Sequence, residues 1–262
     1  MEATIASPKE FSKLMALVAA FDPNFNMKCG KDGIKIFCMD AAKTCVIEIT
    51  MPSSFFTSYT FTSKQTDQLE LGIHIEIILK TLKGAKKDDI LTLSTKEGSD
   101  TISLTLTGGE RQIQYDIKLM NIEEDVLNIP PVEYNLLIEL ASRHIKSWKT
   151  DITDLTGEQI DFKPTPDNIQ LSSESDGTTI KASLVQSDSL VYRTFNKPCE
   201  VGLKPKPLAV AGKIADICDS VQFGWMNGAP VNVKADLDSG CNISMWFAPT
   251  MNSDDDEMET DA

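Results

Sequence analysis

A segment with neither helical nor strand pattern divides this chain into two halves that follow the same plan. Residues 118–134 contain four carboxylates, the adjacent prolines Pro130 and Pro131, and spaced apolar residues. Proline fixes φ and removes a hydrogen-bond donor, so the segment is poor material for a helix or a central strand. We interpret it as a connector between two domains. Its apolar residues are compatible with two interpretations. The segment is either an ordinary linker that packs on a core or a surface that binds another molecule.

Apolar residues recur with the 3.6-residue period of a helix in four places, two in each half. The first helix is expected over about 8–20, where Ser7 is placed to cap it and Pro8 stands in the first turn. The second is expected to end at Gly84. The four predicted apolar faces are Phe11, Leu14, Met15 and Val18; Ile75, Ile78, Leu79 and Leu82; Ala141, Ile145, Trp148 and Ile152; and Val210, Ile214, Ile217 and Val221.

Between these helices the apolar period changes to two, and turn residues separate the runs, which predicts antiparallel hairpins. The expected strands lie at 33–38, 44–51, 90–95, 101–106 and 112–118 in the first half, and at 168–173, 178–184, 231–237 and 241–247 in the second. Each half is therefore predicted to be α+β, with antiparallel sheets and two amphipathic helices packed on them.

Length and charge narrow the class of protein. A chain of 262 residues exceeds the usual single domain of about 100 to 150 residues. We expect an N-terminal domain over 1–118, a connector over 119–133, a C-terminal domain over 134–250 and an acidic disordered tail over 251–262. A net charge of −14 argues against coating nucleic acid with the whole surface, so any DNA contact must be local. No signal peptide or apolar run of about 18 residues is present, which predicts a soluble protein that is not secreted.

The residues that carry catalysis or bind metals are sparse. Six cysteines include no C-x-x-C pair, and the only histidines are His74 and His144, neither beside a nucleophile motif. Gly108 and Gly109 are not followed by the G-K-[ST] of a phosphate-binding loop. We therefore expect no enzyme activity, no cofactor and no metal site, and cysteines that stay reduced.

Basic residues gather on the predicted helices although the chain is acidic. A row of basic side chains along one face of a helix suits contact with DNA phosphates. The alternative is an ordinary solvent-exposed face, because Lys and Arg are good helix formers. These residues are Lys9, Lys13, Lys80, Lys83, Lys86, Lys87, Arg143, Lys146, Lys149 and Lys213.

Several motifs in register resemble the eukaryotic-type DNA sliding clamps, the proliferating cell nuclear antigen family. They are Gly33-Ile-Lys-Ile36, Met39-Asp40, Lys118-Leu-Met120, Ile129-Pro130 with Tyr134, and Phe247-Ala-Pro249. The resemblance runs over about 1–249 and is closest over 33–134. It implies a homotrimeric ring of two-domain subunits that encircles double-stranded DNA of any sequence as a polymerase processivity factor. It also implies a nuclear location, or a replication compartment if the gene is viral.

The resemblance further implies three sets of residues, which we carry over position by position. The DNA-facing set is Lys13, Lys80, Lys83, Lys87, Arg143, Lys146, Lys149 and Lys213. The set for peptides of polymerases, clamp loaders, ligases and nucleases is Met39, Thr44, Val46, Leu127, Ile129, Pro130, Tyr134, Pro230, Trp246, Phe247, Ala248 and Pro249. The subunit-interface set is Ile113, Tyr115, Ile117, Thr178, Ile180 and Ala182.

Some positions depart from the family pattern. Lys43 stands where the family commonly has histidine, Trp246 replaces the more usual tyrosine, and Pro166 occupies the position of a regulatory lysine. Without the resemblance, Trp246 and Phe247 read as core residues of a last strand. Two alternative functions stay open: a subunit of a heterotrimeric or checkpoint-type clamp, and a polymerase accessory protein that forms no ring.

Overall fold

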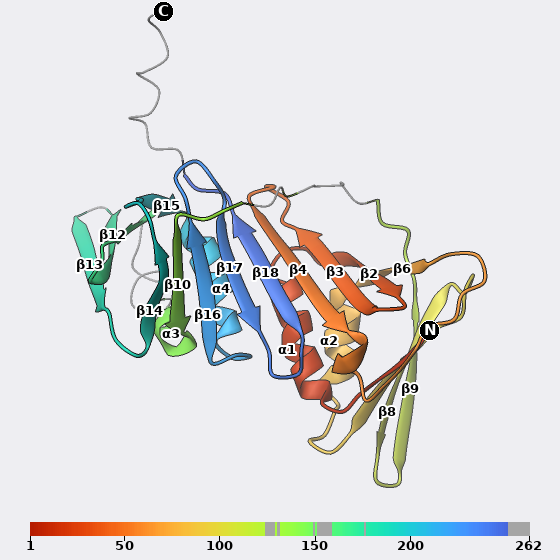
Figure 1. The fold of residues 1–262 in the computed structure, drawn as a ribbon. Helices are drawn as coiled ribbons and strands as arrows, with labels where there is room; N and C mark the ends of the chain where they lie inside the picture. The colour runs from red at the N-terminus through yellow and green to blue at the C-terminus, as the bar shows by residue number, and fades with distance from the viewer. Residues whose placement is uncertain (124–128, 130–131, 149, 151–158, 176, 251–262) are drawn as a thin grey trace, which may run out of the picture. The chain divides into compact units, whose positions relative to one another are not determined.

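The computed structural model describes residues 1–123, 129, 132–148, 150, 159–175 and 177–250. The chain divides into two compact units. The first comprises Met1–Ile129 with Asp236–Met245, and the second comprises Pro130–Ala235 with Trp246–Ala262. Each unit combines antiparallel sheets with two helices, so the predicted α+β class is confirmed (Figure 1).

The first unit contains two groups of strands and two longer helices. One group has the order β5-β1-β7-β8-β9, and in the other β4, β3, β2 and β6 are neighbours in that order. All the pairings are antiparallel. The elements are β1 (Glu2–Ile5), α1 (Pro8–Val18), β2 (Asn24–Gly30), β3 (Gly33–Met39), β4 (Cys45–Pro52), the 3-10 turn η1 (Ser53–Phe55), β5 (Ser58–Thr60), β6 (Gln68–His74), α2 (Ile75–Leu82), β7 (Ile90–Ser94), β8 (Thr101–Gly108) and β9 (Arg111–Lys118).

Helix α1 follows the sequence prediction closely. The Ser7 hydroxyl accepts a hydrogen bond from the Glu10 backbone N–H at 3.2 Å, which satisfies one of the free donors of the first turn. All four residues of its predicted apolar face are fully buried. In Figure 1, α1 and α2 lie side by side on one face of the sheet that contains β2, β3 and β4. Burial of these apolar faces, at about 25 cal/mol per Å², stabilises the unit.

The second unit repeats the plan. In one group β14, β10, β16 and β17 are neighbours in that order, and the other group has the order β13-β12-β11-β15, again antiparallel throughout. The last strand, β18 (Asn242–Phe247), begins in the first unit and ends in the second. The other elements are β10 (Leu136–Ala141), α3 (Ser142–Trp148), β11 (Ile160–Pro164), β12 (Asn168–Ser175), β13 (Thr178–Val185), β14 (Leu190–Phe195), β15 (Val201–Leu203), α4 (Pro205–Ile214), β16 (Ser220–Trp225) and β17 (Val231–Asp236).

The predicted fourth helix was too long. Helix α4 ends at Ile214, and Val221 instead belongs to β16, where it pairs with Leu140 of β10. The spacing of the apolar residues in 217–223 fits the period of a helix and that of a strand almost equally well. This segment forms a strand because β16 pairs with a neighbouring strand on each side. In the third helix, Ala141 likewise ends β10, while Ile152 lies outside the described residues.

The second helix is shorter than the run of lysines that follows it. Helix α2 ends at Leu82 with Lys83 as its C-cap, so Lys86 and Lys87 lie beyond the helix and not on it. The Asp89 carboxylate accepts a hydrogen bond from the Lys86 backbone N–H at 2.9 Å and fixes this loop in a non-helical path. Both lysine side chains are exposed.

Candidate DNA-facing and partner-binding surfaces

The basic residues that remain on helices lie opposite the buried faces. Lys13 on α1, Lys80 on α2 and Lys213 on α4 are exposed, as are Arg143 and Lys146 on α3. Since the helices bury their apolar sides, these bases point away from the core of their own unit. Lys149 lies outside the described residues. Of the bases predicted to face DNA, those in the described helices are therefore exposed.

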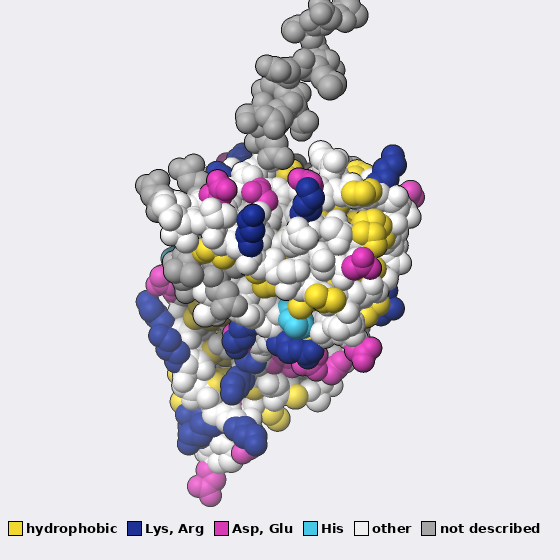
Figure 2. Space-filling view, turned by 90° about the vertical axis from the view of Figure 1, so that its left-hand side faces the viewer, with side chains coloured by type: hydrophobic (Ala, Val, Ile, Leu, Met, Phe, Trp, Pro, Cys, Tyr) yellow, Lys and Arg dark blue, Asp and Glu magenta, His cyan; other side chains and the backbone are white. Residues whose placement is uncertain are grey.

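Two of these lysines are paired with carboxylates on the same surface. Lys80 Nζ lies 3.2 Å from Glu76 Oε2 one helical turn earlier. Lys146 Nζ lies 2.9 Å from Asp216 Oδ1, which links α3 to the residues just after α4. Figure 2 shows Lys and Arg side chains interspersed with Asp and Glu side chains on one face of the molecule. Glu76 and Asp216 were not predicted from the sequence, although the i, i+4 spacing of Glu76 and Lys80 is a readable signal.

The loop between β3 and β4 is built around Asp40. Its Oδ1 accepts hydrogen bonds from the backbone N–H groups of Thr44 at 2.8 Å and Cys45 at 2.7 Å, and its Oδ2 accepts one from the Thr44 hydroxyl at 3.2 Å. Lys43 takes a positive φ of 55° to close the loop. In the adjoining ladder Met39 pairs with Val46. The fold thus brings Met39, Thr44 and Val46 together, as expected for one side of a peptide site.

The start of the connector is held against β6 and β2. The Met120 backbone N–H donates to the Gly72 carbonyl at 2.8 Å, and Asn26 Nδ2 donates to the Ile122 carbonyl at 3.0 Å. A Cβ on Gly72 would lie 2.2 Å from the Met120 oxygen, so this close approach requires glycine. Ile129 is half-buried, whereas Leu127 and Pro130 lie outside the described residues.

The second unit places Tyr134 over the sheet. A Cβ on Gly224 would lie 2.7 Å from the Tyr134 ring, so the ring rests directly on that glycine. The Tyr134 hydroxyl donates to the Pro230 carbonyl at 3.1 Å. Burial raises the pKa of this hydroxyl, which therefore stays protonated and able to donate. Gly224 is the supporting residue that the sequence did not reveal.

The last residues of the described chain differ in exposure. Trp246 and Pro249 are half-buried, Ala248 is exposed, and Phe247 is buried with 1 % of its surface exposed. Trp246, Ala248 and Pro249 therefore keep some exposed surface, while Phe247, expected at the peptide site, packs inward.

Strands β9 and β13 each occupy the edge of a sheet. Their outer backbone groups are available for pairing with another strand. Ile113, Tyr115, Ile180 and Ala182 are half-buried, Thr178 is exposed and Ile117 is buried.

The described residues offer little that is suited to catalysis or metal binding. Among the described part of the chain, no three His, Cys, Asp or Glu side chains are grouped so that they could hold a metal ion. His144 Nε2 lies 2.9 Å from the Ser189 hydroxyl, and burial followed by the nearby Arg143 charge lowers the pKa of His144. None of the helices in these residues has the length and apolar character to cross a membrane.

The chain is similar to known sliding clamps. Residues 1–127 match the sequence model described as proliferating cell nuclear antigen, N-terminal domain. The proliferating cell nuclear antigen of Chaetomium thermophilum is 22% identical over 263 residues, covering 97% of this chain and 100% of that protein. The similarity to proliferating cell nuclear antigen therefore extends beyond the N-terminal domain, over nearly the whole chain.

Two further proteins show the same similarity. DNA polymerase sliding clamp 1 of Pyrobaculum aerophilum is 21% identical, covering 94% of this chain and 96% of that protein. The crystal structure of proliferating cellular nuclear antigen from Entamoeba histolytica superimposes with a TM-score of 0.88 at 19% identity, covering 95% of this chain and 98% of that one. The predicted two-domain clamp fold is confirmed. Identities near 20% show that the chain has diverged from these proteins.

Proposed function

We infer that this protein is a DNA sliding clamp, a processivity factor that keeps a polymerase on its template. The observation that carries this function is the match to sliding clamps along nearly the whole chain. The exposed bases on α1, α2, α3 and α4 support it. The protein acts as a scaffold and works in the nucleus, where its substrate DNA lies.

Three copies of the chain form a closed ring through their sheet edges. Strand β9 of one subunit pairs with β13 of the next, using Ile113, Tyr115 and Ile117 against Thr178, Ile180 and Ala182. Both strands lie at sheet edges and neither contains proline, so each retains the donors needed for a ladder. A heterologous interface of this kind closes into a ring when its rotation fits.

The ring holds duplex DNA through the phosphate backbone. Contacts from lysine and arginine to phosphates position a protein without reading sequence. Ion pairs such as Lys146 with Asp216 leave the attraction moderate, which suits sliding. A ring that cannot leave the duplex sideways keeps a bound polymerase at high local concentration.

Partner proteins bind through short peptides at the predicted groove residues. Apolar anchors that bury about 100 to 200 Å² each contribute several kcal/mol at about 25 cal/mol per Å². Ordering costs reduce this gain, and micromolar affinity is expected. Polymerases, clamp loaders, ligases and nucleases are the proposed partners.

Light scattering at low micromolar concentration tests the ring. We expect a mass of three times the 28.9 kDa chain. Ile180→Lys puts a charge on a half-buried side of β13 and should yield monomers, while Thr179→Lys on the exposed side of the same strand is the matched control. A monomeric wild type contradicts the homotrimer and points to a heterotrimeric clamp or a non-ring accessory protein.

Retention on DNA tests the clamp function itself. After loading on nicked circular DNA by a clamp loader with ATP, a closed ring stays bound at high salt and is lost when the circle is cut. Equal retention on cut and uncut DNA contradicts sliding.

A further inference from the structure

A buried asparagine on β2 holds the start of the connector. Asn26 has 4 % of its surface exposed, and its Nδ2 donates a hydrogen bond to the Ile122 carbonyl at 3.0 Å. Asparagine is depleted in strands, and burial of an amide is costly unless it is hydrogen-bonded. An apolar residue would therefore suit β2 itself better than Asn26 does. What Asn26 supplies is a hydrogen-bond donor for a segment 96 residues later.

The residue opposite Asn26 in the sheet holds the same segment. Asn26 pairs with Gly72 of β6, and the Gly72 carbonyl accepts a hydrogen bond from the Met120 backbone N–H at 2.8 Å. A Cβ on Gly72 would lie 2.2 Å from the Met120 oxygen and 3.1 Å from Ile122 Cδ1, so both connector residues lie directly on this glycine. We call Gly72 and Asn26 the connector clasp. One cross-strand pair thus holds two residues of the connector.

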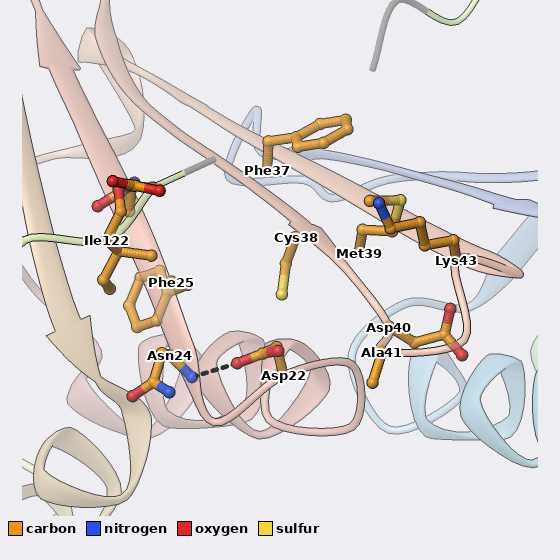
Figure 3. Close-up of a pocket in the computed structure, with 12 residues that line it drawn as sticks. Asp22, Asn24, Phe25, Phe37, Cys38, Met39, Asp40, Ala41, Lys43 and Ile122 are labelled. Atoms are coloured by element: carbon orange, nitrogen blue, oxygen red, sulfur yellow. Dashed lines mark hydrogen bonds between the residues drawn. The ribbon is translucent and has the colours of Figure 1, made fainter. Parts of the chain in front are cut away.

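Packing alone does not fix this segment. Figure 3 shows the Ile122 side chain near Phe25, among the residues that line a cavity of about 450 Å³. Met120 keeps 45 % of its surface exposed. Apolar contacts are non-directional, and a segment beside a cavity has room to shift along the sheet. Hydrogen bonds depend on distance and angle, so the clasp selects one position of the segment.

We propose that the connector clasp positions the peptide site. By holding Met120 and Ile122 in one register, it places the connector residues of the predicted groove, which follow them in the sequence. Gly72 and Asn26 act through the connector and not by contact with the peptide. The inference rests on the proposed peptide-binding function and names residues outside the predicted groove that control it.

Amide hydrogen exchange of the free protein tests the clasp. Asn26→Leu keeps the approximate size of the side chain and removes the donor. It should lower the protection of the Met120 amide about five- to tenfold, the effect of one lost hydrogen bond, while the amides of β2 and β6 keep their protection. An equal loss over both strands would mean that Asn26 only stabilises the sheet, and no loss at Met120 would mean that the connector is held without it. Either result overturns the proposal.

Fluorescence anisotropy provides the functional readout. The probe is a synthetic core peptide that carries a glutamine and hydrophobic anchors, and Asn26→Leu should weaken its binding about five- to tenfold. Asn26→Asp also removes the donor but keeps a polar side chain, so the same loss in both variants excludes a packing defect caused by leucine. Asn121→Leu is the matched control, because it makes the same change at an exposed connector residue between the two that are held. It should leave peptide affinity and Met120 protection unchanged.

The two measurements separate failure of the clasp from failure of the groove. Lower Met120 protection with unchanged peptide affinity in Asn26→Leu would mean that the clasp does not position the site, which overturns the proposal. A wild type that does not bind the core peptide contradicts the proposed peptide-binding function. In that case the exchange measurement still decides whether the clasp fixes the connector.

Discussion

The Tyr134 hydroxyl donates a hydrogen bond to the Pro230 carbonyl at 3.1 Å, joining residues 96 positions apart in the sequence. Both were expected at the peptide site, and their link orients the tyrosine ring over Gly224. The ring rests so close to that glycine that a single methyl group would displace it.

Gly224→Ala should therefore weaken peptide binding about tenfold or more and lower the free energy of unfolding by about 1 to 3 kcal/mol, the usual cost of overpacking. Titration calorimetry with the core peptide and urea denaturation provide the two measurements. Tyr134→Phe keeps the ring and removes only the hydroxyl, so it should cost much less affinity. Unchanged affinity in Gly224→Ala would mean that the tyrosine ring is not part of the site.

Removing the carboxylate partners of the helix lysines should strengthen DNA binding. Asp216→Asn and Glu76→Gln release Lys146 and Lys80 from their ion pairs, and exposed pairs of this kind are worth up to about 1 kcal/mol. We expect affinity for duplex DNA to rise about two- to fivefold at low salt, with the gain lost at high salt.

The control for this experiment is Glu70→Gln, which removes a carboxylate 3.9 Å from Lys28 in the sheet of the first unit. It deletes the same charge away from the helices and should leave DNA affinity unchanged. A gain as large as that of Asp216→Asn would show that net charge, and not the helix faces, controls binding.

Asp89 should make the first unit sensitive to acid. The backbone N–H of Lys86 and then the Arg111 guanidinium hold the pKa of Asp89 below its ordinary value of 3.8. A lowered folded pKa gives stability that is present above pH 3.8 and is lost as the pH falls toward the folded pKa. Asp89→Asn should lower the melting temperature by several degrees at pH 7 and by less near pH 3. Asp88→Asn, on an exposed neighbour, should change neither value.

The cysteines should react unequally with Ellman's reagent. Burial raises the pKa of Cys29 and Cys241 to about 12 and that of Cys199 to about 11, so little thiolate exists at pH 8. Cys218 is a half-exposed thiol that forms no disulfide, and it should react first. Cys218→Ser should remove the fast phase of the native protein, and a fast phase that persists would mean that a buried thiol becomes accessible.

Local patterns predicted much of each unit. The apolar spacing of Phe11, Leu14, Met15 and Val18 and the cap at Ser7 place α1 correctly. Alternation and turn residues likewise place β3, β8 and β12. These features depend on neighbours within a few residues, so the sequence contains the information directly.

Strand β2 was not predicted, although Phe25, Met27 and Cys29 alternate with polar residues in its sequence. The structure departs from this pattern at Asn26, which is buried with 4 % of its surface exposed and whose amide donates to the Ile122 carbonyl 96 residues later. Strand pairing on both sides also turned the expected end of the fourth helix into β16.

The sequence by itself determined the α+β class, most elements and the identity of the basic and apolar candidates. Tertiary structure alone decided that Asp216 lies beside Lys146, that Gly224 supports Tyr134, and that β2 and β3 part after Asn26 and Phe37. The physical reason is that the hydrophobic period and helix capping depend on residues only a few positions apart in the sequence. Ion pairs, close approaches and cavities instead depend on atoms brought together from distant positions.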